Sequence, residues 1–209
     1  MSLKRDRLVR FWLHFFGWLP FIILILQWQT DNLTVNPIQA ATRFTGDWAL
    51  IFLLLSLACT PLYILFKWRI PLKFRRPLGL YAFLYASIHF LIYVWIDYGW
   101  DWEYILPSLR EKPFILAGAS ALFILLLLAL TSFDFSPRWL GKAWKLLHRL
   151  VYLAGVLVIL HFAWASKGDL LRLSGEILRP FIAALVLAVL LIIRIPHFRR
   201  WIQTLRSKE

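Results

Sequence analysis

Three histidines lie inside apolar segments of the chain: His89, His148 and His161. His148 and His161 both come from LHRLVYLAGVLVILHFAW, residues 147–164. An imidazole can bind a metal or carry a proton near neutral pH, whereas apolar segments otherwise exclude titratable groups. Two neutral imidazoles that face each other across a helical bundle suit a six-coordinate haem iron. The alternative, for any one of these histidines taken alone, is an interhelical hydrogen bond.

The carboxylates lie outside these segments. All eleven fall in loops, in tails or at the edge of an apolar segment: Asp6, Asp31, Asp47, Asp97, Asp101, Glu103, Glu111, Asp134, Asp169, Glu176 and Glu209. Proton pumps and cation carriers usually need an intramembrane carboxylate, and di-iron bundles need several glutamates. No histidine is followed by glutamate, which excludes the H-E-x-x-H motif of zinc proteases. Of the remaining histidines, His14 is predicted to be interfacial and His197 to belong to a basic cytoplasmic face.

The composition is that of a membrane protein, because 61% of the 209 residues are hydrophobic and 17% are aromatic. No polar block interrupts the chain, so we expect one transmembrane domain over residues 1–209. The single cysteine, Cys59, excludes an internal disulfide, and the absence of C-x-x-C-H excludes a covalently attached c-type haem. The net charge of +13 is explained by basic residues beside apolar spans and does not predict nucleic-acid binding.

Six segments are long and apolar enough to predict transmembrane helices, so the expected fold is an all-α, six-helix membrane bundle. The predicted spans cover about 11–28, 48–66, 78–96, 114–131, 146–165 and 177–195. Seventeen lysines and arginines fall at one side of these spans, whereas six fall in the loops of the other side. Because basic residues collect on the cytoplasmic side, both termini are predicted to be cytoplasmic.

The predicted topology places His89 and His161 at comparable depth, in spans that run in the same direction. His148 and His161 are about 20 Å apart along one helix and some 140° apart around it. Their spacing therefore does not put them on one face, although Gly155 between them permits bending or close packing. Arg75 and Arg76 are most simply cytoplasmic-side charges, and the functional alternative is contact with haem propionates or a flavin phosphate.

Several segments resemble the MsrQ (YedZ) family, within the wider ferric-reductase-like transmembrane group. They are RFTGDWAL (43–50), TPL (60–62), RRPLGLYAFLYASIHFLIY (75–93) and LGKAWKLLHRLVYLAGVLVILHFAW (140–164). The resemblance covers nearly the whole chain. It implies a multi-pass protein of the bacterial inner membrane that binds haem and serves a periplasmic methionine sulfoxide reductase system.

The resemblance also implies the cofactors and the site. Electrons would pass from the cytoplasm through a flavin, FMN, and one or two b-type haems to a periplasmic molybdopterin-containing subunit that reduces methionine sulfoxide in envelope proteins. His89, His148 and His161 are the implied iron ligands. In two-haem relatives a further histidine lies fourteen residues before the first of these, and here that position is Arg75. An outer haem on His89 and His161 is therefore implied, whereas an inner site at His148 lacks its usual partner, and His148 either holds a second haem or lies beside the flavin.

Two other functions compete with an electron conduit. One is a stand-alone membrane ferric or quinone reductase, which differs only in its electron acceptor. The other is a transporter with a histidine proton relay, which the lack of intramembrane carboxylates and of a repeat disfavours. No G-x-G-x-x-G motif is present, so the electron donor is expected to be a diffusing flavin reductase, a quinol or another cytoplasmic partner. The loops at 29–47 and 97–113 form the expected docking surface for the periplasmic subunit.

Overall fold

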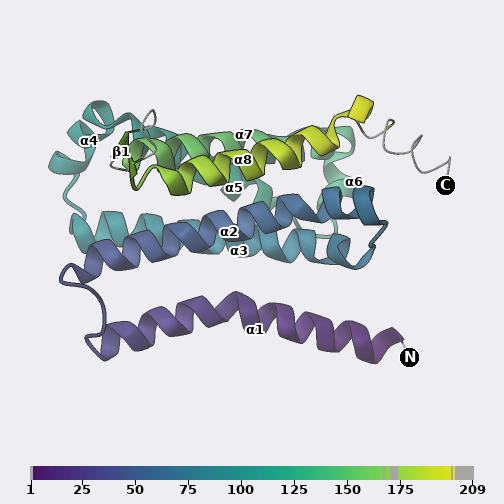
Figure 1. Cartoon of the computed structure of the whole chain (residues 1–209), viewed down its shortest axis with the longest axis horizontal. Helices are drawn as coiled ribbons and strands as arrows, with labels where there is room; N and C mark the ends of the chain where they lie inside the picture. Colours follow the sequence, from purple (N-terminus) through teal and green to yellow (C-terminus); the bar gives the residue numbers. More distant parts are fainter. Residues whose placement is uncertain (1, 167, 170–173, 199, 201–209) are drawn as a thin grey trace.

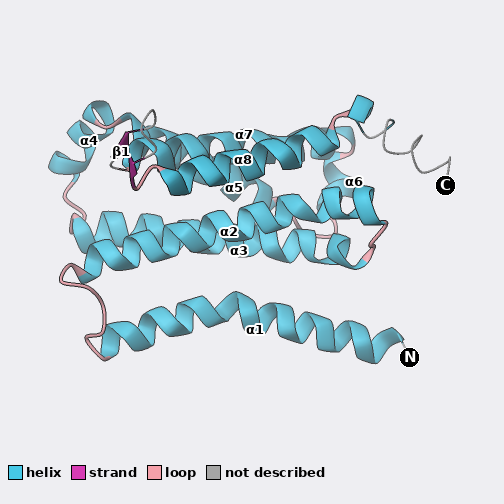
Figure 2. Cartoon of the chain, in the orientation of Figure 1, coloured by secondary structure: helices cyan, strands magenta, loops and turns pink. Residues whose placement is uncertain are grey.

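The chain is an all-α protein apart from one pair of two-residue strands. A computed structural model describes residues 2–166, 168–169, 174–198 and 200. The elements, in chain order, are α1 (Ser2–Gln29), α2 (Pro37–Phe66), α3 (Ile70–Leu91), the π-helix η1 (Ile92–Asp97), α4 (Trp102–Glu111), α5 (Pro113–Leu130), α6 (Ser136–Leu140), α7 (Lys142–Ala165), β1 (Gly168–Asp169), β2 (Ser174–Gly175) and α8 (Leu178–Arg194). Helices dominate the view in Figure 2, and β1 pairs antiparallel with β2.

All six segments predicted as spans are helical. Five helices among the described residues are long and apolar enough to cross a membrane: Arg7–Gln29, Pro37–Phe66, Ile70–Asp97, Pro113–Leu130 and Lys142–Ala165. The sixth segment forms α8, which has 17 residues. Helices suit apolar surroundings because they satisfy backbone polar groups internally. The structure thus supports five spans directly, and the sixth stays a prediction.

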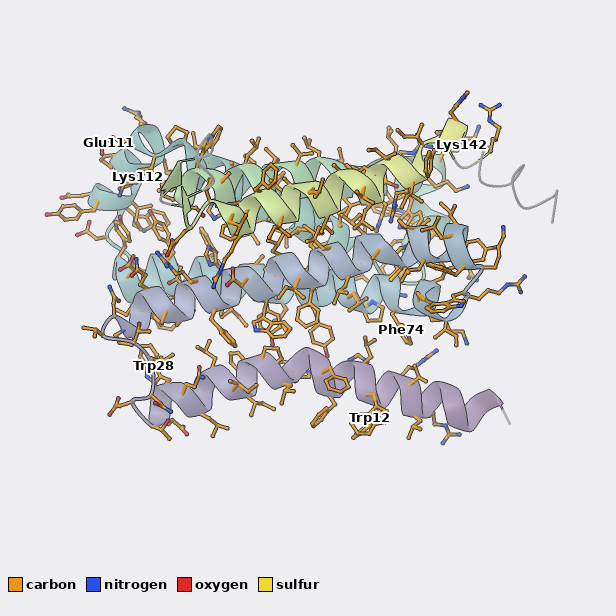
Figure 3. All side chains as sticks on the ribbon, viewed as in Figure 1. Trp12, Trp28, Phe74, Glu111, Lys112 and Lys142 are labelled. Atoms are coloured by element: carbon orange, nitrogen blue, oxygen red, sulfur yellow. The ribbon has the colours of Figure 1, made fainter. Side chains whose placement is uncertain are left out.

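The helices pack as two hairpins, with α8 and α1 added on the outside. The α2–α3 and α5–α7 pairs make the most extensive contacts, and α8 packs against α7 and α2. Figure 1 shows α1 running along the far side of the α2–α3 pair from α8. α1 begins and α8 finishes at the same end of the bundle. We call it the basic end, after the lysines and arginines predicted to gather on that side of the spans. Glu111 and Lys112 lie at the opposite end, and Lys142 lies at the basic end (Figure 3).

Two predicted loops are shorter than expected. The 29–47 loop shrinks because α2 begins at Pro37, where a proline fits the first helical turn and the Asn36 side chain accepts a hydrogen bond from the Gln39 amide at 3.0 Å. The 97–113 loop contains α4, capped by the Asp101 side chain. Pro71 lies in the first turn of α3, just after the turn that separates α2 from α3, whereas Pro77 lies inside α3.

Helix α1 is tied to α3 through two buried tyrosines. The Tyr85 hydroxyl donates to the Gly17 carbonyl at 2.8 Å and accepts from the Phe21 amide at 3.0 Å. These two backbone groups would otherwise bond each other in a regular helix, so the hydroxyl is inserted into one rung of α1 beside Pro20. A Cβ at Gly17 would lie 2.2 Å from the Tyr81 ring, so only glycine permits this approach of α1 to α3.

The main core lies where the two hairpins and α8 meet. Its buried residues come from five helices: Phe52, Leu53, Leu57, Cys59, Leu78, Tyr81, Ala82, Tyr85, Ile124, Leu125, Leu128, Ala154 and Leu187. Gly155 allows close packing here, because a Cβ at this position would lie 3.2 Å from Leu187 of α8. Small residues commonly let helices approach closely in membranes. This core fixes α3 against α5 and α7, which carry the candidate site.

Candidate functional site

His89 of α3 and His161 of α7 meet between the two hairpins. Their ring centroids are 5.9 Å apart and their planes are perpendicular. Both residues are half-buried and lie towards the opposite end of their helices from the basic end. The structure therefore brings together the two histidines that the sequence places at comparable depth.

A backbone carbonyl orients each ring. The His89 Nδ1–H donates to the Thr42 carbonyl of α2 at 2.8 Å, and the His161 Nδ1–H donates to the Phe114 carbonyl of α5 at 2.7 Å. A carbonyl oxygen only accepts, so the proton of each neutral imidazole sits on Nδ1. Each Nε2 then carries a free lone pair, which is the state that a metal ligand requires.

A glycine lies against each ring. A Cβ at Gly46 would lie 3.1 Å from His89 Nδ1, and a Cβ at Gly118 would lie 2.7 Å from His161 Nδ1. Each glycine comes one helical turn after the residue whose carbonyl accepts the hydrogen bond, since Gly46 follows Thr42 and Gly118 follows Phe114. The missing side chains create the two cradles in which the imidazoles rest.

The two hairpins present their histidines in the same way. In each hairpin the histidine follows its carbonyl partner by 47 residues, and the glycine lies at the same offset between them. The spacing is a structural repeat that sequence comparison of the two halves does not reveal, because the surrounding side chains differ. Its signal in the sequence is only a glycine that precedes each histidine at one fixed distance.

The residues fit a haem iron held between His89 and His161. Two imidazoles bound through Nε2 to one metal at about 2 Å would have ring centroids roughly 6 Å apart, which agrees with the separation of these rings. Within the described parts of the chain, no group of three or more His, Cys, Asp or Glu side chains is placed to hold a metal ion. The donor set thus suits a macrocycle that supplies its own equatorial nitrogens better than a bare ion.

His148 lies away from this pair, near the basic end of α7. Its Nε2 is 3.2 Å from the Thr131 hydroxyl, which itself donates to the Leu127 carbonyl at 2.7 Å. Because the hydroxyl proton is used there, His148 Nε2 is the donor. The ring also packs on Trp144 with a centroid separation of 4.2 Å. In the described structure no second histidine contacts His148, so it lacks the paired arrangement of His89 and His161.

Arg75 and Arg76 point to different surroundings. The Arg75 guanidinium is close enough to His148 to act on it electrostatically, and its backbone carbonyl accepts a hydrogen bond from Ser56 at 2.7 Å. Arg76 instead pairs with Asp134 in the turn before α6. The predicted site residue Arg75 is therefore within electrostatic range of His148, and it lies fourteen residues, about four helical turns, before His89 on α3.

Arg194 is a polar residue of the bundle that sequence reasoning counted only among the basic residues of the tail. It donates to the Tyr152 hydroxyl at 2.8 Å and to the Leu57 carbonyl at 2.5 Å. Leu57 needs this donor because its usual helical partner is Pro61, which has no N–H. Tyr152 lies one turn after His148 on α7, so Arg194 supports the same face of that helix.

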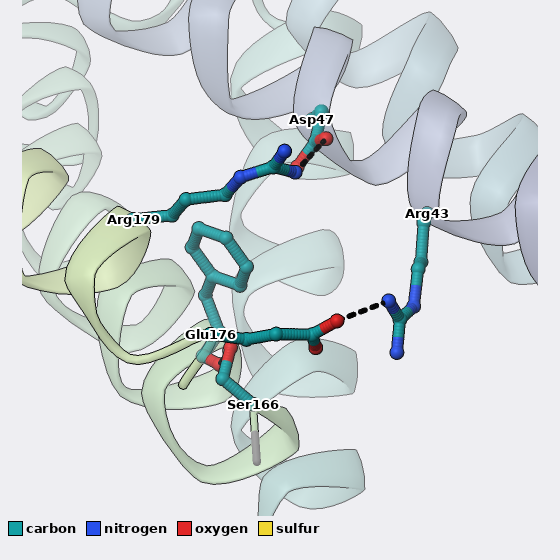
Figure 4. A network of polar contacts seen from close by, with 6 residues as sticks. Arg43, Asp47, Ser166, Glu176 and Arg179 are labelled. Atoms are coloured by element: carbon teal, nitrogen blue, oxygen red, sulfur yellow. Dashed lines mark hydrogen bonds and ion pairs between the residues drawn. The ribbon is translucent and has the colours of Figure 1, made fainter. Parts of the chain in front are cut away.

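Ion pairs secure the other end of α8 beside the carbonyl that holds His89. Arg43 pairs with Glu176 at 2.7 Å, and Asp47 lies 3.8 Å from Arg179, as Figure 4 shows. Arg43 directly follows Thr42 in α2, and Asp47 directly follows Gly46. Asp47 was expected at a span edge and lies within α2. These contacts fasten the start of α8 to the segment that cradles the His89 ring.

Comparison with known proteins assigns the chain to a family. The family described as ferric reductase like transmembrane component matches residues 45–160. A protein-methionine-sulfoxide reductase heme-binding subunit, MsrQ, of Herminiimonas arsenicoxydans is 42% identical over 192 residues, which cover 91% of this chain and 84% of the relative. The chain belongs to the MsrQ family. MsrQ of Rhodospirillum rubrum is 41% identical over 94% of this chain and 92% of its own, and MsrQ of Azospira oryzae is 44% identical over 78% and 67%.

The MsrQ assignment agrees with the architecture. The family match contains Gly46, Arg75, His89, Gly118 and His148, and it ends one residue before His161. With its five candidate spans, this MsrQ family member is a multi-pass membrane protein. No solved structure matches the chain.

Proposed function

We propose that the protein is the haem-binding membrane subunit of a methionine sulfoxide reductase system, and that it conducts electrons across the membrane. The observation that carries this proposal is the His89–His161 pair, with both Nε2 atoms available and the ring centroids 5.9 Å apart. The printed names of its MsrQ relatives, which describe heme-binding subunits of protein-methionine-sulfoxide reductase, support it.

His89 and His161 are the proposed axial ligands of a b-type haem. When bound, the haem supplies a one-electron carrier whose potential depends on its axial ligands and burial. The protein contributes the two oriented imidazoles, the glycine cradles and an apolar surrounding that excludes water. His148 and Arg75 are assigned to the basic end of the path, beside a second haem or the flavin, because they lie near each other there.

The proposed path runs from the cytoplasm to the periplasm of a bacterial inner membrane. It requires six spans with both termini cytoplasmic, so that α8 completes one domain over residues 1–209. The donor is a cytoplasmic flavin reductase or a quinol, with FMN as an intermediate carrier. The acceptor is a periplasmic molybdopterin-containing subunit that reduces methionine sulfoxide. Two exposed tryptophans, Trp100 and Trp102, lie in the 97–113 segment predicted to dock this subunit.

The deciding experiment is a dithionite-reduced minus oxidised absorption spectrum of the detergent-purified protein. The wild type is expected to give a low-spin b-type signal, and His89→Ala and His161→Ala should each abolish it. The exposed His197 provides the control, since His197→Ala should leave the spectrum unchanged. A partial loss of the wild-type signal in His148→Ala would assign a second haem to the basic end.

The result that would overturn the proposal is a folded, colourless protein purified from cells supplied with haem. A second measurement separates an electron conduit from a stand-alone reductase. Reduced protein should be reoxidised by methionine sulfoxide only when the periplasmic subunit is added. Equal reoxidation by ferric chelates or quinone without that subunit would favour the stand-alone reductase.

A further inference from the structure

A groove of about 470 Å³ lies at the basic end, where α6 meets the start of α7. Figure 3 shows Lys142, the first residue of α7, at this end of the molecule. A space of this size accommodates a small ligand or the headgroup of a lipid. The residues that line it are Pro137, Gly141, Lys142, Lys145, Leu146 and Arg149.

Three of the lining residues are cationic and none is anionic. Lys142, Lys145 and Arg149 follow one another at intervals of three and four residues, so they lie on one face of α7. All three are exposed, and in the described part of the chain none of them forms an ion pair. The carboxylate that precedes α6, Asp134, pairs with Arg76 instead. Because like charges on one helix face repel one another, an anion bound between them would stabilise this face.

The start of α7 also favours an anion. Its first turn contains no acidic residue, and no side chain caps it. The first backbone N–H groups of a helix lack intrahelical partners and carry partial positive charge, so lysines there are unfavourable. Lys142 and Lys145 both lie among the first four residues of α7. An anion at the groove would offset the charge of the helix start as well as that of the lysines.

The groove has an apolar side as well. Leu146 lines it between Lys145 and Arg149 and is 67% exposed, and Trp139 of the adjoining α6 is 80% exposed. Exposed aromatic residues beside cations are typical of the interface between membrane and water. An occupant that is anionic at one end and apolar at the other matches both sides of the groove.

The depth of Arg149 distinguishes a lipid from a soluble partner. Arg149 lies about 10 Å further along the helix axis than Lys142, inside a helix that is long and apolar enough to cross a membrane. An acidic protein surface in the aqueous phase would meet the lysines but would not reach Arg149. A phospholipid headgroup lies in the interface, where it can contact all three cations.

We propose that this groove binds an anionic phospholipid of the leaflet at the basic end, with its phosphate between Lys142, Lys145 and Arg149 and its acyl chains against Leu146. Basic clusters beside a transmembrane helix are typical sites for anionic headgroups. The lipid would hold the start of α7, where His148 directly precedes Arg149. The proposal is independent of haem binding and of electron transfer.

Native mass spectrometry of the full chain in detergent tests this site by titration with phosphatidylglycerol or with phosphatidylcholine of the same acyl chains. The wild type should bind phosphatidylglycerol more tightly than phosphatidylcholine. In the triple variant Lys142→Gln, Lys145→Gln and Arg149→Gln, the apparent Kd for phosphatidylglycerol should rise at least about tenfold. Each basic residue near a membrane surface contributes roughly a fivefold preference for anionic lipid, so loss of three residues exceeds that threshold.

The matched control is Arg7→Gln with Lys67→Gln and Arg69→Gln. It removes the same charge from exposed positions that do not line the groove, and it should bind phosphatidylglycerol as the wild type does. A further variant exchanges lysine for arginine, and arginine for lysine, at the three groove positions. It keeps the charge, so it should also bind as the wild type does. Circular dichroism of each variant checks that the helices are retained.

A loss of affinity confined to the triple variant supports the proposal. An equal loss in the control overturns it, because the attraction would then be spread over the whole basic end. Unchanged affinity in the triple variant also overturns it, and so does a wild type without preference between the two lipids, which would leave the groove to an acidic protein surface. Displacement of the lipid by excess inorganic phosphate would overturn it in favour of a soluble anion. Absorption spectra of the same preparations report the proposed haem site separately.

Discussion

Backbone carbonyls, not side chains, orient both rings of the His89–His161 pair. A carbonyl cannot be removed by substituting the side chain, so a change at Thr42 should disturb the pair little. Phe114 also packs its own ring against His161, with centroids 5.8 Å apart. The sensitive positions are instead the two glycines, because any side chain there meets an imidazole. At the scale of single residues, the site therefore depends on the absence of a side chain at Gly46 and at Gly118.

Gly118→Ala should weaken haem binding. Its Cβ would lie 2.7 Å from His161 Nδ1, closer than ordinary contact, so the ring must shift and lose its 2.7 Å bond to the Phe114 carbonyl. Loss of such an orienting partner typically lowers metal affinity about 10–100-fold. Haem titration of the purified apoprotein measures this change.

Gly79→Ala provides the control for this substitution. The same Cβ on α3 would meet only Ser56 Oγ at 3.5 Å, an ordinary contact, so haem affinity should remain that of the wild type. Gly46→Ala, with its 3.1 Å approach to His89, should have an effect between the two. Equal haem affinity in all three variants would contradict the prediction that the glycines make room for the imidazole rings.

Arg194→Met should destabilise the bundle, because it leaves the Leu57 carbonyl without a donor. The expected loss is about 1–3 kcal/mol in the free energy of unfolding. Pro61→Ala restores an N–H at the position that normally bonds Leu57, so Arg194→Met should cost less in the Pro61→Ala background. Thermal unfolding of the four proteins in detergent measures the coupling, and strictly additive effects would show that Arg194 does not serve this carbonyl.

Residue types and depth were enough to select His89 and His161 from the sequence, but their orientation was not predictable. Every residue has a backbone carbonyl, so the residue types at positions 42 and 114 do not indicate that Thr42 and Phe114 accept these hydrogen bonds. The cradle glycines are visible only once the helices are paired. Arg194 was hidden for another reason, since a basic residue at a span end is usually a cytoplasmic-side charge.

At the scale of elements, α1 is held to the bundle by few polar contacts, and Tyr85 makes two of them. Its hydroxyl bridges the Gly17 carbonyl and the Phe21 amide of α1, which would bond each other in a regular helix, next to Pro20. The helix bends near its middle in Figure 1, where a proline and an inserted side chain both interrupt the regular bonding. The polar attachment of α1 to α3 therefore depends mainly on Tyr85, with Tyr81 adding one contact to His14 at 2.9 Å.

Tyr85→Phe should loosen α1 without removing the aromatic packing. We expect the free energy of unfolding to fall by about 1–3 kcal/mol, because the Gly17 carbonyl and Phe21 amide lose their shared partner. Hydrogen exchange of the Phe21 amide should accelerate, measured by mass spectrometry of peptides from α1. Tyr104→Phe, at an exposed position of α4, should change neither quantity. Unchanged hydrogen exchange in Tyr85→Phe would mean that the Phe21 amide bonds the Gly17 carbonyl directly and does not need the hydroxyl.

The apolar segments were sufficient to predict the helices but not their ends. Pro37 and Pro71 lie in the first turns of α2 and α3 and so mark helix starts, whereas Pro77 lies inside α3. Proline lacks only one donor, which the first turn of a helix does not need. Helix α4 was missed because its mixed charges and aromatic residues, with Pro107 among them and Pro113 shortly after, indicated a loop.

At the scale of the whole molecule, the number of crossings is set by α8. Its 17 residues would span about 26 Å as a helix, slightly less than a typical hydrocarbon core. Arg194 at one end and the Arg43–Glu176 pair near the other could both remain at the interfaces across this length. Whether α8 crosses decides if the two ends of the chain lie on the same side of the membrane.

Reporter fusions test this crossing. A fluorescent protein fused after Glu209 should fluoresce, because the predicted C-terminus is cytoplasmic. Alkaline phosphatase inserted after Lys112 should be active, since this loop is predicted to be periplasmic. If alkaline phosphatase fused after Glu209 is active instead, either α8 lies along the membrane or the orientation is reversed. The insertion after Lys112 separates these two cases, because it stays active in the first and becomes inactive in the second.

The matched hairpins have a consequence for small gaseous ligands. Each histidine of the pair has the same type of carbonyl partner, the same 47-residue separation from it and the same glycine support. His89 and His161 would hold the proposed haem through their Nε2 atoms, one from α3 and one from α7. With both histidines supported in this way, the site would offer carbon monoxide and oxygen no free place to bind, and the haem would supply electron transfer alone.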